Sequence, residues 1–310
     1  MSRRKGIAVA VLMAAIVAVS AAVTAFTGVS HTAPDGQRRI VASFYPVYIA
    51  ALNVTDGVDG VSLTSLAGPQ TGCLHDYQLT PDDRIALGQA DALLLNGAGA
   101  ESFLDDLLVT LPDLQTVDLS AGIDLLEEDE HEHEEHEDHD HANEHIWVSP
   151  ARYAKQVENL RDGLCTLDPA HAAQYRANAA AYLEKIAAVQ EETRALTASL
   201  KDTDAIVFHE SLAYLADDLG LRVIAEIPIG EDTAVSAADL AQAERAVQPD
   251  RPLWLMYDSQ YPTGDYDYLA KKAGSSRILT LDTAVRGAAD KDGWLTAMRE
   301  DLARMKGALS

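Results

Sequence analysis

Basic side chains are scarce in this sequence of 310 residues, in which 24 Lys and Arg stand against 49 Asp and Glu. The formal net charge is −25. Because phosphate groups are bound by clustered Lys and Arg, this shortage argues against a nucleic-acid partner. The hydrophobic share of 47% is nevertheless ample for a folded chain, and the length suffices for two domains with a core each.

Cysteine is almost absent, with only Cys73 and Cys165 in the chain. The sequence leaves two readings open, one disulfide formed in an oxidising compartment or two buried thiols. No cysteine stands directly after the apolar run at the N-terminus, so we expect no lipid-attachment signal of the bacterial lipoprotein kind.

Residues 1–37 are expected to form a signal peptide or membrane anchor with a short linker. Arg3, Arg4 and Lys5 precede roughly twenty apolar or small residues, a pattern typical of a membrane-targeting segment. Cleavage after Val23-Thr24-Ala25 and retention as a spanning anchor both fit this run. In either case we expect the body of the protein to be extracytoplasmic, in the periplasm or at the outer face of the membrane.

Short runs rich in β-branched residues alternate with helical patterns from Arg39 onward. "RIVASF", "GVSLTSL", "DALLLN" and "LQTVDL" are predicted strands, and "DAIVFH", "RVIAEI", "PLWLMY" and "SRILTL" follow later in the chain. Helices are expected between them, for example from Pro81 with Thr80 as N-cap, from about Glu101 to Thr110, and from about Asp265. The pattern predicts an α/β fold with two lobes, each a roughly four-stranded parallel sheet flanked by helices.

Proline and glycine are missing between Pro169 and Leu200, a stretch rich in Ala, Glu, Gln and Leu. It predicts a single helix of roughly 45 Å. A helix of this length is expected to be a spacer between the lobes more than a core element. We therefore expect an N-terminal lobe over residues 38–167, a bridging helix over 168–202 and a C-terminal lobe over 203–310, with a ligand-binding cleft between the lobes.

Four candidate metal ligands fall at the carboxyl ends of predicted strands or in the loops that follow them. They are His75, His145, His209 and Asp282. Taken singly, each histidine is more typical of a hydrogen-bonded or exposed residue, and the aspartate of a helix cap. Their joint placement, two from each lobe, predicts a cation between the lobes. Three histidines and one carboxylate suit a closed Zn²⁺ site, while Mn²⁺ or Fe²⁺ remains possible.

An acidic, histidine-rich run over residues 127–144 precedes His145 and contains eleven carboxylates. Its histidines are His131, His133, His136, His139 and His141. Such a segment cannot bury a core, so we expect it to be disordered and able to bind several cations weakly. We interpret it as an accessory zinc-collecting or zinc-sensing loop, with a solvated filler as the alternative.

Two enzyme signatures are incomplete. "NGAGAE" lacks the third glycine of a dinucleotide-binding turn and is read as a tight strand-to-helix turn. "HESLA" would make Glu210 the general base of a zinc hydrolase, but the second histidine of His-Glu-x-x-His is missing. We therefore expect no enzymatic activity.

Several segments together resemble the metal-binding solute-binding proteins of zinc and manganese ABC importers, and most closely the zinc-binding branch. These segments are "VASFYPVYIAALNV", "HDYQLTPDDRIALGQADALLLNGAGAESFLDDLL", "EHIWVSPARYAKQVENLRDGL", "LDPAHAAQYRANAAAYLEKI", "FHESLAYLADDLGL" and "ILTLDTA". The resemblance runs from about Arg39 to the C-terminus. It implies two four-stranded lobes bridged by one long helix, with the cation buried between them.

By motif, the family's ligands fall on His75 of "HDYQLTP", His145 of "HIWVSP" and His209 of "FHESLAYLA". The carboxylate that some members use falls on Asp282 of "LTLDTA", where zinc-binding members often have water instead. The sequence departs from the family around Cys73 and at Gln78, and "YDSQYP" replaces the usual "EPQ", which leaves Asp258 near the site without an assigned role.

The resemblance also implies a monomeric, extracytoplasmic, high-affinity zinc receptor that delivers the cation to an ABC permease. Alternatives are manganese or iron as cargo, or an extracellular zinc buffer or adhesin that works without a transporter.

Overall fold

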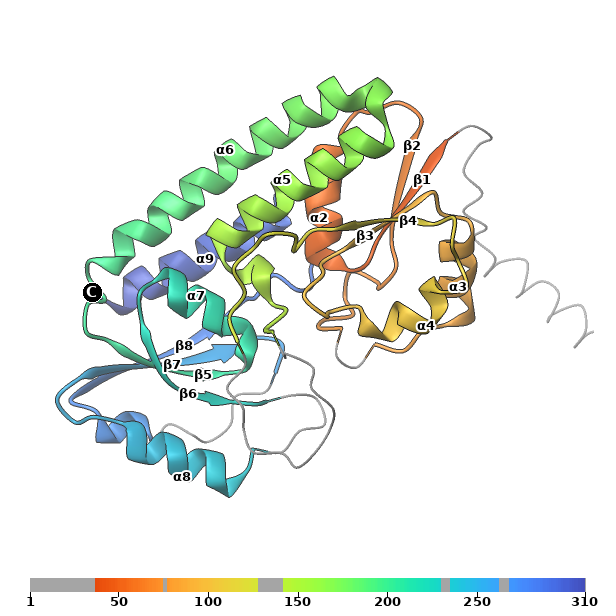
Figure 1. Ribbon diagram of the computed structural model, residues 1–310. Helices are drawn as coiled ribbons and strands as arrows, with labels where there is room; N and C mark the ends of the chain where they lie inside the picture. Colours follow the sequence, from red (N-terminus) through yellow and green to blue (C-terminus); the bar gives the residue numbers. More distant parts are fainter. Residues whose placement is uncertain (1–36, 75–76, 128–141, 230–234, 262–267, 310) are drawn as a thin grey trace, which may run out of the picture. The chain divides into compact units, whose positions relative to one another are not determined.

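Two parallel sheets with the same strand order form the framework of the computed structural model (Figure 1). The structure describes residues 37–74, 77–127, 142–229, 235–261 and 268–309. The first sheet has the order β2-β1-β3-β4 and the second β6-β5-β7-β8, with every pair parallel. The strands are β1 (Arg38–Ala42), β2 (Val61–Ser65), β3 (Ala92–Leu95), β4 (Gln115–Asp118), β5 (Asp204–Phe208), β6 (Arg222–Ile227), β7 (Pro252–Asp258) and β8 (Ser275–Leu281). The predicted fold class is confirmed.

Both faces of the first sheet are covered, as alternation along its central strands requires. Val41 and Leu93 pack into an outer cluster with leucines of α3 and α4. Ile40, Ala42 and Leu94 point the other way, into a large core that also takes in residues of the second sheet. The two sheets thus share one continuous hydrophobic core.

The helices lie between the strands in the predicted alternating order. They are α2 (Tyr45–Val54), α3 (Pro81–Gly88), α4 (Asp105–Leu108), α5 (Pro150–Leu167), α6 (Ala172–Thr197), α7 (Ala213–Asp218), α8 (Ala237–Ala246) and α9 (Gly293–Ala308). Thr80 caps α3 as predicted: its hydroxyl accepts from the Asp83 N–H, and the Asp83 carboxylate accepts from the Thr80 N–H. None of the helices in the described residues has the length and apolar character needed to cross a membrane.

The long helix α6 is a core element and not only a spacer. Its buried residues recur at alternating intervals of three and four: Ala172, Tyr175, Ala179, Tyr182, Ile186, Val189, Thr193 and Leu196. This spacing gives one continuous apolar stripe on a helix. Figure 1 shows α5 lying alongside α6, and the stripe packs into the core that both sheets share. The predicted long helix between the lobes is confirmed, but its burial in the core was not expected, because the stripe is hidden among many alanines and glutamates.

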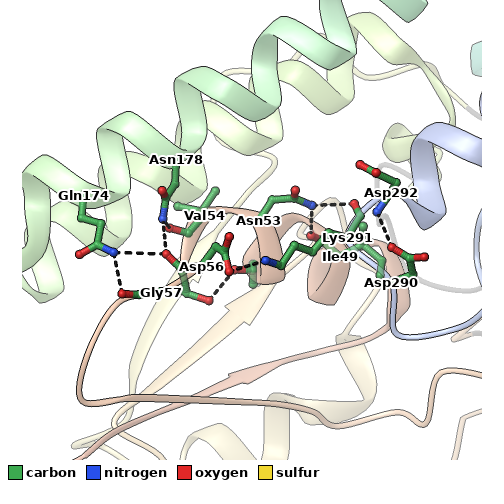
Figure 2. Close-up of polar contacts among 12 residues, drawn as sticks. Ile49, Asn53, Val54, Asp56, Gly57, Gln174, Asn178, Asp290, Lys291 and Asp292 are labelled. Carbon is green, nitrogen blue, oxygen red and sulfur yellow. Dashed lines mark hydrogen bonds and ion pairs between the residues drawn. The ribbon is translucent and has the colours of Figure 1, made fainter.

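Polar contacts fix α6 to the end of α2 (Figure 2). Asn178 donates to the carbonyl of Val54 at 3.0 Å, and Gln174 donates to that of Gly57 at 2.7 Å. The Asn53 amide donates to the Lys291 carbonyl at 2.8 Å, and the Lys291 ammonium pairs with Asp56. These bonds satisfy the carbonyls at the helix end while they join α2, α6 and the segment before α9.

Buried aromatic side chains join the loops of the two lobes. The Trp147 indole donates to the carbonyl of Thr283 at 2.8 Å, and the Trp294 indole donates to the carbonyl of Trp147 at 2.9 Å. Tyr45 donates to the Ala288 carbonyl at 3.0 Å. Because these donors are buried, the bonds fix residues before α5 against residues after β8.

Some local expectations were wrong or lie outside the described residues. The predicted helix from Glu101 to Thr110 is a 3-10 turn over Ser102–Leu104 followed by the single turn α4. The helix predicted from about Asp265 begins within residues 262–267, which lie outside the described residues. The described residues between them and β8 contain a 3-10 turn over Ala270–Lys272. Residues 1–36 of the predicted targeting segment and linker (1–37) are also outside the described residues, so this segment stays a prediction.

The cysteines do not form a disulfide. The Cys165 thiol contacts the carbonyl of Ala172 at 3.5 Å, whereas the Cys73 sulfur lies 3.2 Å from Nε2 of His145. The lobe boundaries given above remain a prediction.

Candidate metal centre

His209 follows directly after β5, at the carboxyl edge of the second sheet and next to its central strand pair. Its backbone φ is 107°, in the region that favours glycine. A non-glycine residue held there carries strain, which is found most often at functional sites. The ring is 3% exposed, and its Nδ1 accepts from the Ser211 N–H at 3.1 Å.

His145 lies in the segment between β4 and α5 and is 1% exposed. The Oδ1 atom of Asn143 accepts from its backbone N–H at 3.0 Å and lies 3.1 Å from its Nδ1. Because a carbonyl oxygen only accepts, Nδ1 carries the hydrogen and the neutral ring has its lone pair on Nε2. This is the arrangement in which an outer partner orients a metal-binding imidazole.

Asn143 is itself held by the second lobe. The Nδ2 atom of Asn143 donates to the backbone carbonyl of Glu210 at 2.9 Å. The Tyr214 hydroxyl donates to the backbone carbonyl of Asn143 at 2.6 Å. Tyr214 in turn accepts from the Leu126 N–H at 3.1 Å. The orientation of His145 in one lobe therefore depends on residues directly after β5 in the other.

The structure brings His145 and His209 together, with ring centroids 5.1 Å apart and planes nearly perpendicular. Ligand atoms of His145, His209 and Glu210 all lie within 4.8 Å of one another. Tyr261 stacks on the His209 ring at 4.8 Å, and Trp147 lies 5.1 Å from the His145 ring. Two imidazoles and a carboxylate, enclosed by aromatic rings, form a donor set suited to Zn²⁺ or a similar divalent cation.

A second group of potential ligands shares His145. Cys73, Glu144 and His145 also offer ligand atoms within 4.8 Å of one another. The prediction did not include Cys73 and Glu144 as potential ligands, although Cys73 stands two residues before a predicted ligand and Glu144 directly before another. The position of each residue beside a predicted histidine ligand was the signal in the sequence that could have identified it.

Asp282 belongs to neither of these groups in the described part of the chain. It follows β8, where its Oδ1 accepts from the Ala284 N–H at 2.9 Å, and its own N–H donates to Asp301 at 2.8 Å. Burial raises the pKa of this carboxyl above its ordinary value, and the charge of Asp258 raises it further. Its assignment as a ligand stays a prediction.

Asp258 has the structural role that the sequence left open. It is 1% exposed, and its Oδ2 accepts from the hydroxyls of Ser211 and Thr283, each at 3.0 Å. Its Oδ1 accepts from the Gln260 N–H at 3.0 Å. One buried carboxylate therefore joins the loops after β5, β7 and β8 at the edge where His209 stands.

Other predicted site residues lie outside the described residues. They are His75 and the accessory histidines His131, His133, His136, His139 and His141. Their roles stay predictions.

Comparisons with known proteins agree with this fold. A family model described as ZnuA, zinc-uptake complex component A, periplasmic, matches residues 40–308. The zinc-binding lipoprotein AdcA of Streptococcus pneumoniae serotype 4 is 28% identical over 247 residues, which are 77% of this chain and 49% of AdcA. The iron-binding protein YfeA of Yersinia pestis is 30% identical over 196 residues, 63% of this chain and 60% of YfeA.

The chain spans about half the length of the AdcA relatives that it matches. The crystal structure of ZnuA superposes with a TM-score of 0.67 at 27% identity, covering 88% of this chain and 100% of that one. Since the family model covers nearly all of the chain beyond residue 37, the chain belongs to the ZnuA family, whose members are substrate-binding proteins and not enzymes.

Proposed function

We propose that this protein is an extracytoplasmic receptor that binds one Zn²⁺ between its lobes and delivers it to an ABC permease. The observation that carries the proposal is the meeting of His145 and His209, two buried imidazoles from different lobes with centroids 5.1 Å apart. These two predicted ligands are joined here by Glu210. His75 and Asp282 complete the proposed set.

The donor chemistry supports a transition-metal cargo. Imidazole nitrogen suits zinc, iron and copper, whereas magnesium and calcium are bound mainly by oxygen ligands. A carboxylate within reach also suits manganese and iron. Iron is the second candidate cargo because the relative YfeA is named as an iron-binding protein.

Delivery to a permease is supported by family membership, because ZnuA-family proteins work with ABC transporter permeases. The proposed localisation outside the cytoplasm agrees with the predicted targeting segment and with the periplasmic description of the family. An extracellular zinc buffer would use the same site without a permease. Zinc uptake by cells lacking the protein, with and without its reintroduction, separates these two roles.

The test of the binding site compares the full chain, a variant lacking residues 128–141, and His209→Ala in the deletion background. Each protein is dialysed against excess zinc and then zinc-free buffer, and bound metal is measured by mass spectrometry. The expected result is about one retained zinc in the deletion variant and none after His209→Ala, because a site of pre-oriented imidazoles should hold zinc through the second dialysis.

A matched control is His171→Ala, which removes a histidine that instead pairs with Asp168 at 2.8 Å. It should retain zinc. If the deletion variant holds no zinc, the acidic run is the principal binding element and the proposed site is wrong.

A further inference from the structure

The second group of potential ligands contains a sulfur atom, which the zinc-site prediction did not use. Sγ of Cys73 lies 3.2 Å from Nε2 of His145, the nitrogen that Asn143 leaves with its lone pair. A carboxylate oxygen of Glu144 completes the group within 4.8 Å. Cys73 and His145 come from different loops of the first lobe, far apart in sequence.

The distance between sulfur and nitrogen is close to what one metal ion would require. With Zn–S of about 2.3 Å, Zn–N of about 2.0 Å and tetrahedral angles, the two ligand atoms stand about 3.5 Å apart. The observed 3.2 Å differs from that by a few tenths of an ångström. Small rotations of the two side chains would therefore admit the ion.

A structural role as half of a disulfide does not explain this placement, because Cys165 contacts the Ala172 carbonyl and the two cysteines are not bonded. Cys73 is half-buried and lines a cavity of about 150 Å³ together with Tyr77, Gln260, Tyr261 and Arg286. That volume is enough for about five water molecules. A hydrated cation thus has space beside the sulfur.

We propose that Cys73 binds, as a thiolate, the same cation that His145 binds. This rests on the proposed function and adds a ligand that distinguishes one metal from another. Coordination forms a sulfur–metal bond and releases the thiol proton to solvent. Because thiolate is a soft ligand, Cys73 favours Zn²⁺ over Mn²⁺, which prefers oxygen ligands.

The first test uses Co²⁺ as a spectroscopic substitute for Zn²⁺ in the metal-free full-length protein, under reducing conditions. A thiolate bound to Co²⁺ gives a sulfur-to-metal charge-transfer absorption in the near ultraviolet. We expect this absorption in the wild-type protein and in the matched control Cys165→Ser, and its loss in Cys73→Ser. Tight Co²⁺ binding without the absorption in the wild-type protein, or its persistence in Cys73→Ser, would overturn the proposal.

Affinities for Zn²⁺ and Mn²⁺ show whether Cys73 is a metal ligand or only packs beside the site. Cys73→Ser should weaken Zn²⁺ binding by at least about tenfold, the scale typical of changes next to a metal site, and should change Mn²⁺ binding less. Equal losses for both metals would contradict a sulfur ligand. A wild-type protein that holds no metal tightly would instead refute the proposed function itself, so the two failures are distinct.

A measurement on the unmodified chain covers the case in which Cys73→Ser folds poorly. The protein is alkylated with iodoacetamide, with and without Zn²⁺, and each cysteine is followed by peptide mass spectrometry. Zinc should protect Cys73 and leave the rate at Cys165 unchanged. Equal alkylation of Cys73 in both conditions would overturn the proposal.

Discussion

The orientation of His145 depends on one side chain, the amide of Asn143. That amide contacts both the backbone N–H and Nδ1 of His145, and its own Nδ2 is held by the Glu210 carbonyl. Asn143→Ala leaves the proposed ligands in place but frees the ring. We expect Zn²⁺ affinity to fall by about 10- to 100-fold, as measured by competition with a chromogenic chelator.

Asn143→Asp is the matched variant, because it keeps an oxygen at the Oδ1 position, while it replaces the amide that donates to Glu210 by a charged oxygen. It should bind Zn²⁺ more tightly than Asn143→Ala. Equal affinities for Asn143→Ala and the wild-type protein would contradict the assigned positioning role.

Glu101 makes the stability of the protein depend on pH. It is 6% exposed, and burial raises the pKa of its carboxyl to about 7, even though the N–H groups of Asn96 and Gly97 donate to its oxygens. Above the ordinary glutamate pKa, the unfolded chain releases a proton that the native chain retains. Stability therefore falls as the pH rises from about 4.5 to about 7.

The corresponding variant is Glu101→Gln, which has no proton to release. Relative to the wild-type protein, the variant should therefore become more stable by about 2.5 kcal/mol in free energy of unfolding between pH 5 and pH 8. Urea unfolding at several pH values measures this difference. A constant difference between the two proteins across that range would contradict the assignment.

At the scale of single residues, the sequence could indicate His209 because it directly follows a buried strand, and His145 because it lies in the loop after a predicted strand. It could not indicate Asn143 as the positioning group or Asp258 as the link between three loops. Those roles depend on contacts that are distant in sequence, such as Ser211 with Asp258, 47 positions apart, and Tyr214 with Asn143, 71 positions apart. Residue type alone does not distinguish such an Asn or Asp from a surface one.

At the scale of elements, the packing of α5 on β4 requires a residue without a side chain at Gly163. A Cβ atom there would lie 2.4 Å and 2.9 Å from the two methyl carbons of Val117. Gly163→Ala gains helix propensity of about 1 kcal/mol, but overpacking costs about 1 to 3 kcal/mol. We expect a net destabilisation of about 1 kcal/mol in urea unfolding.

Gly88→Ala, at the end of α3, is the matched control. A Cβ atom added there would have no atom within 4 Å apart from its chain neighbours and the backbone of its own helix. It should leave stability unchanged or raise it slightly. If both variants have the same effect, the close approach of α5 to β4 does not limit stability.

Elements with strong local signals were predictable, and those without them were not. Thr80 and Pro81 fixed the start of α3, and the β-branched run before His209 fixed β5. The segment after Glu101 has apolar residues at helical spacing, but it divides into a 3-10 turn and a single α-helical turn. Packing of Leu104 and Leu107 against the outer face of the sheet, and not helix propensity, accounts for this conformation.

At the scale of the whole molecule, the shared core predicts little movement between the lobes when metal binds. The buried stripe of α6 and the indole hydrogen bonds of Trp147 and Trp294 join both lobes independently of the metal. We expect small-angle X-ray scattering of metal-free and zinc-loaded protein to give the same radius of gyration within error. A clear contraction on zinc binding would show hinge closure and contradict this rigidity.

The architecture could be predicted from the alternation of strand and helix patterns because parallel sheets require it. The joining of both lobes by one core could not, since α6 carries its apolar stripe among many alanines and polar residues. Its tyrosines Tyr175 and Tyr182 lie seven positions apart on the buried stripe, and this spacing was the sequence signal that the prediction did not use.

The central claim is that a cation binds where His145 and His209 meet. The most direct measurement is anomalous X-ray scattering at the zinc absorption edge from crystals of the zinc-loaded protein. The account predicts a strong anomalous peak about 2.0 to 2.1 Å from a ring nitrogen of each histidine. A zinc-loaded crystal with no peak between these two rings, and its zinc bound elsewhere, would contradict it.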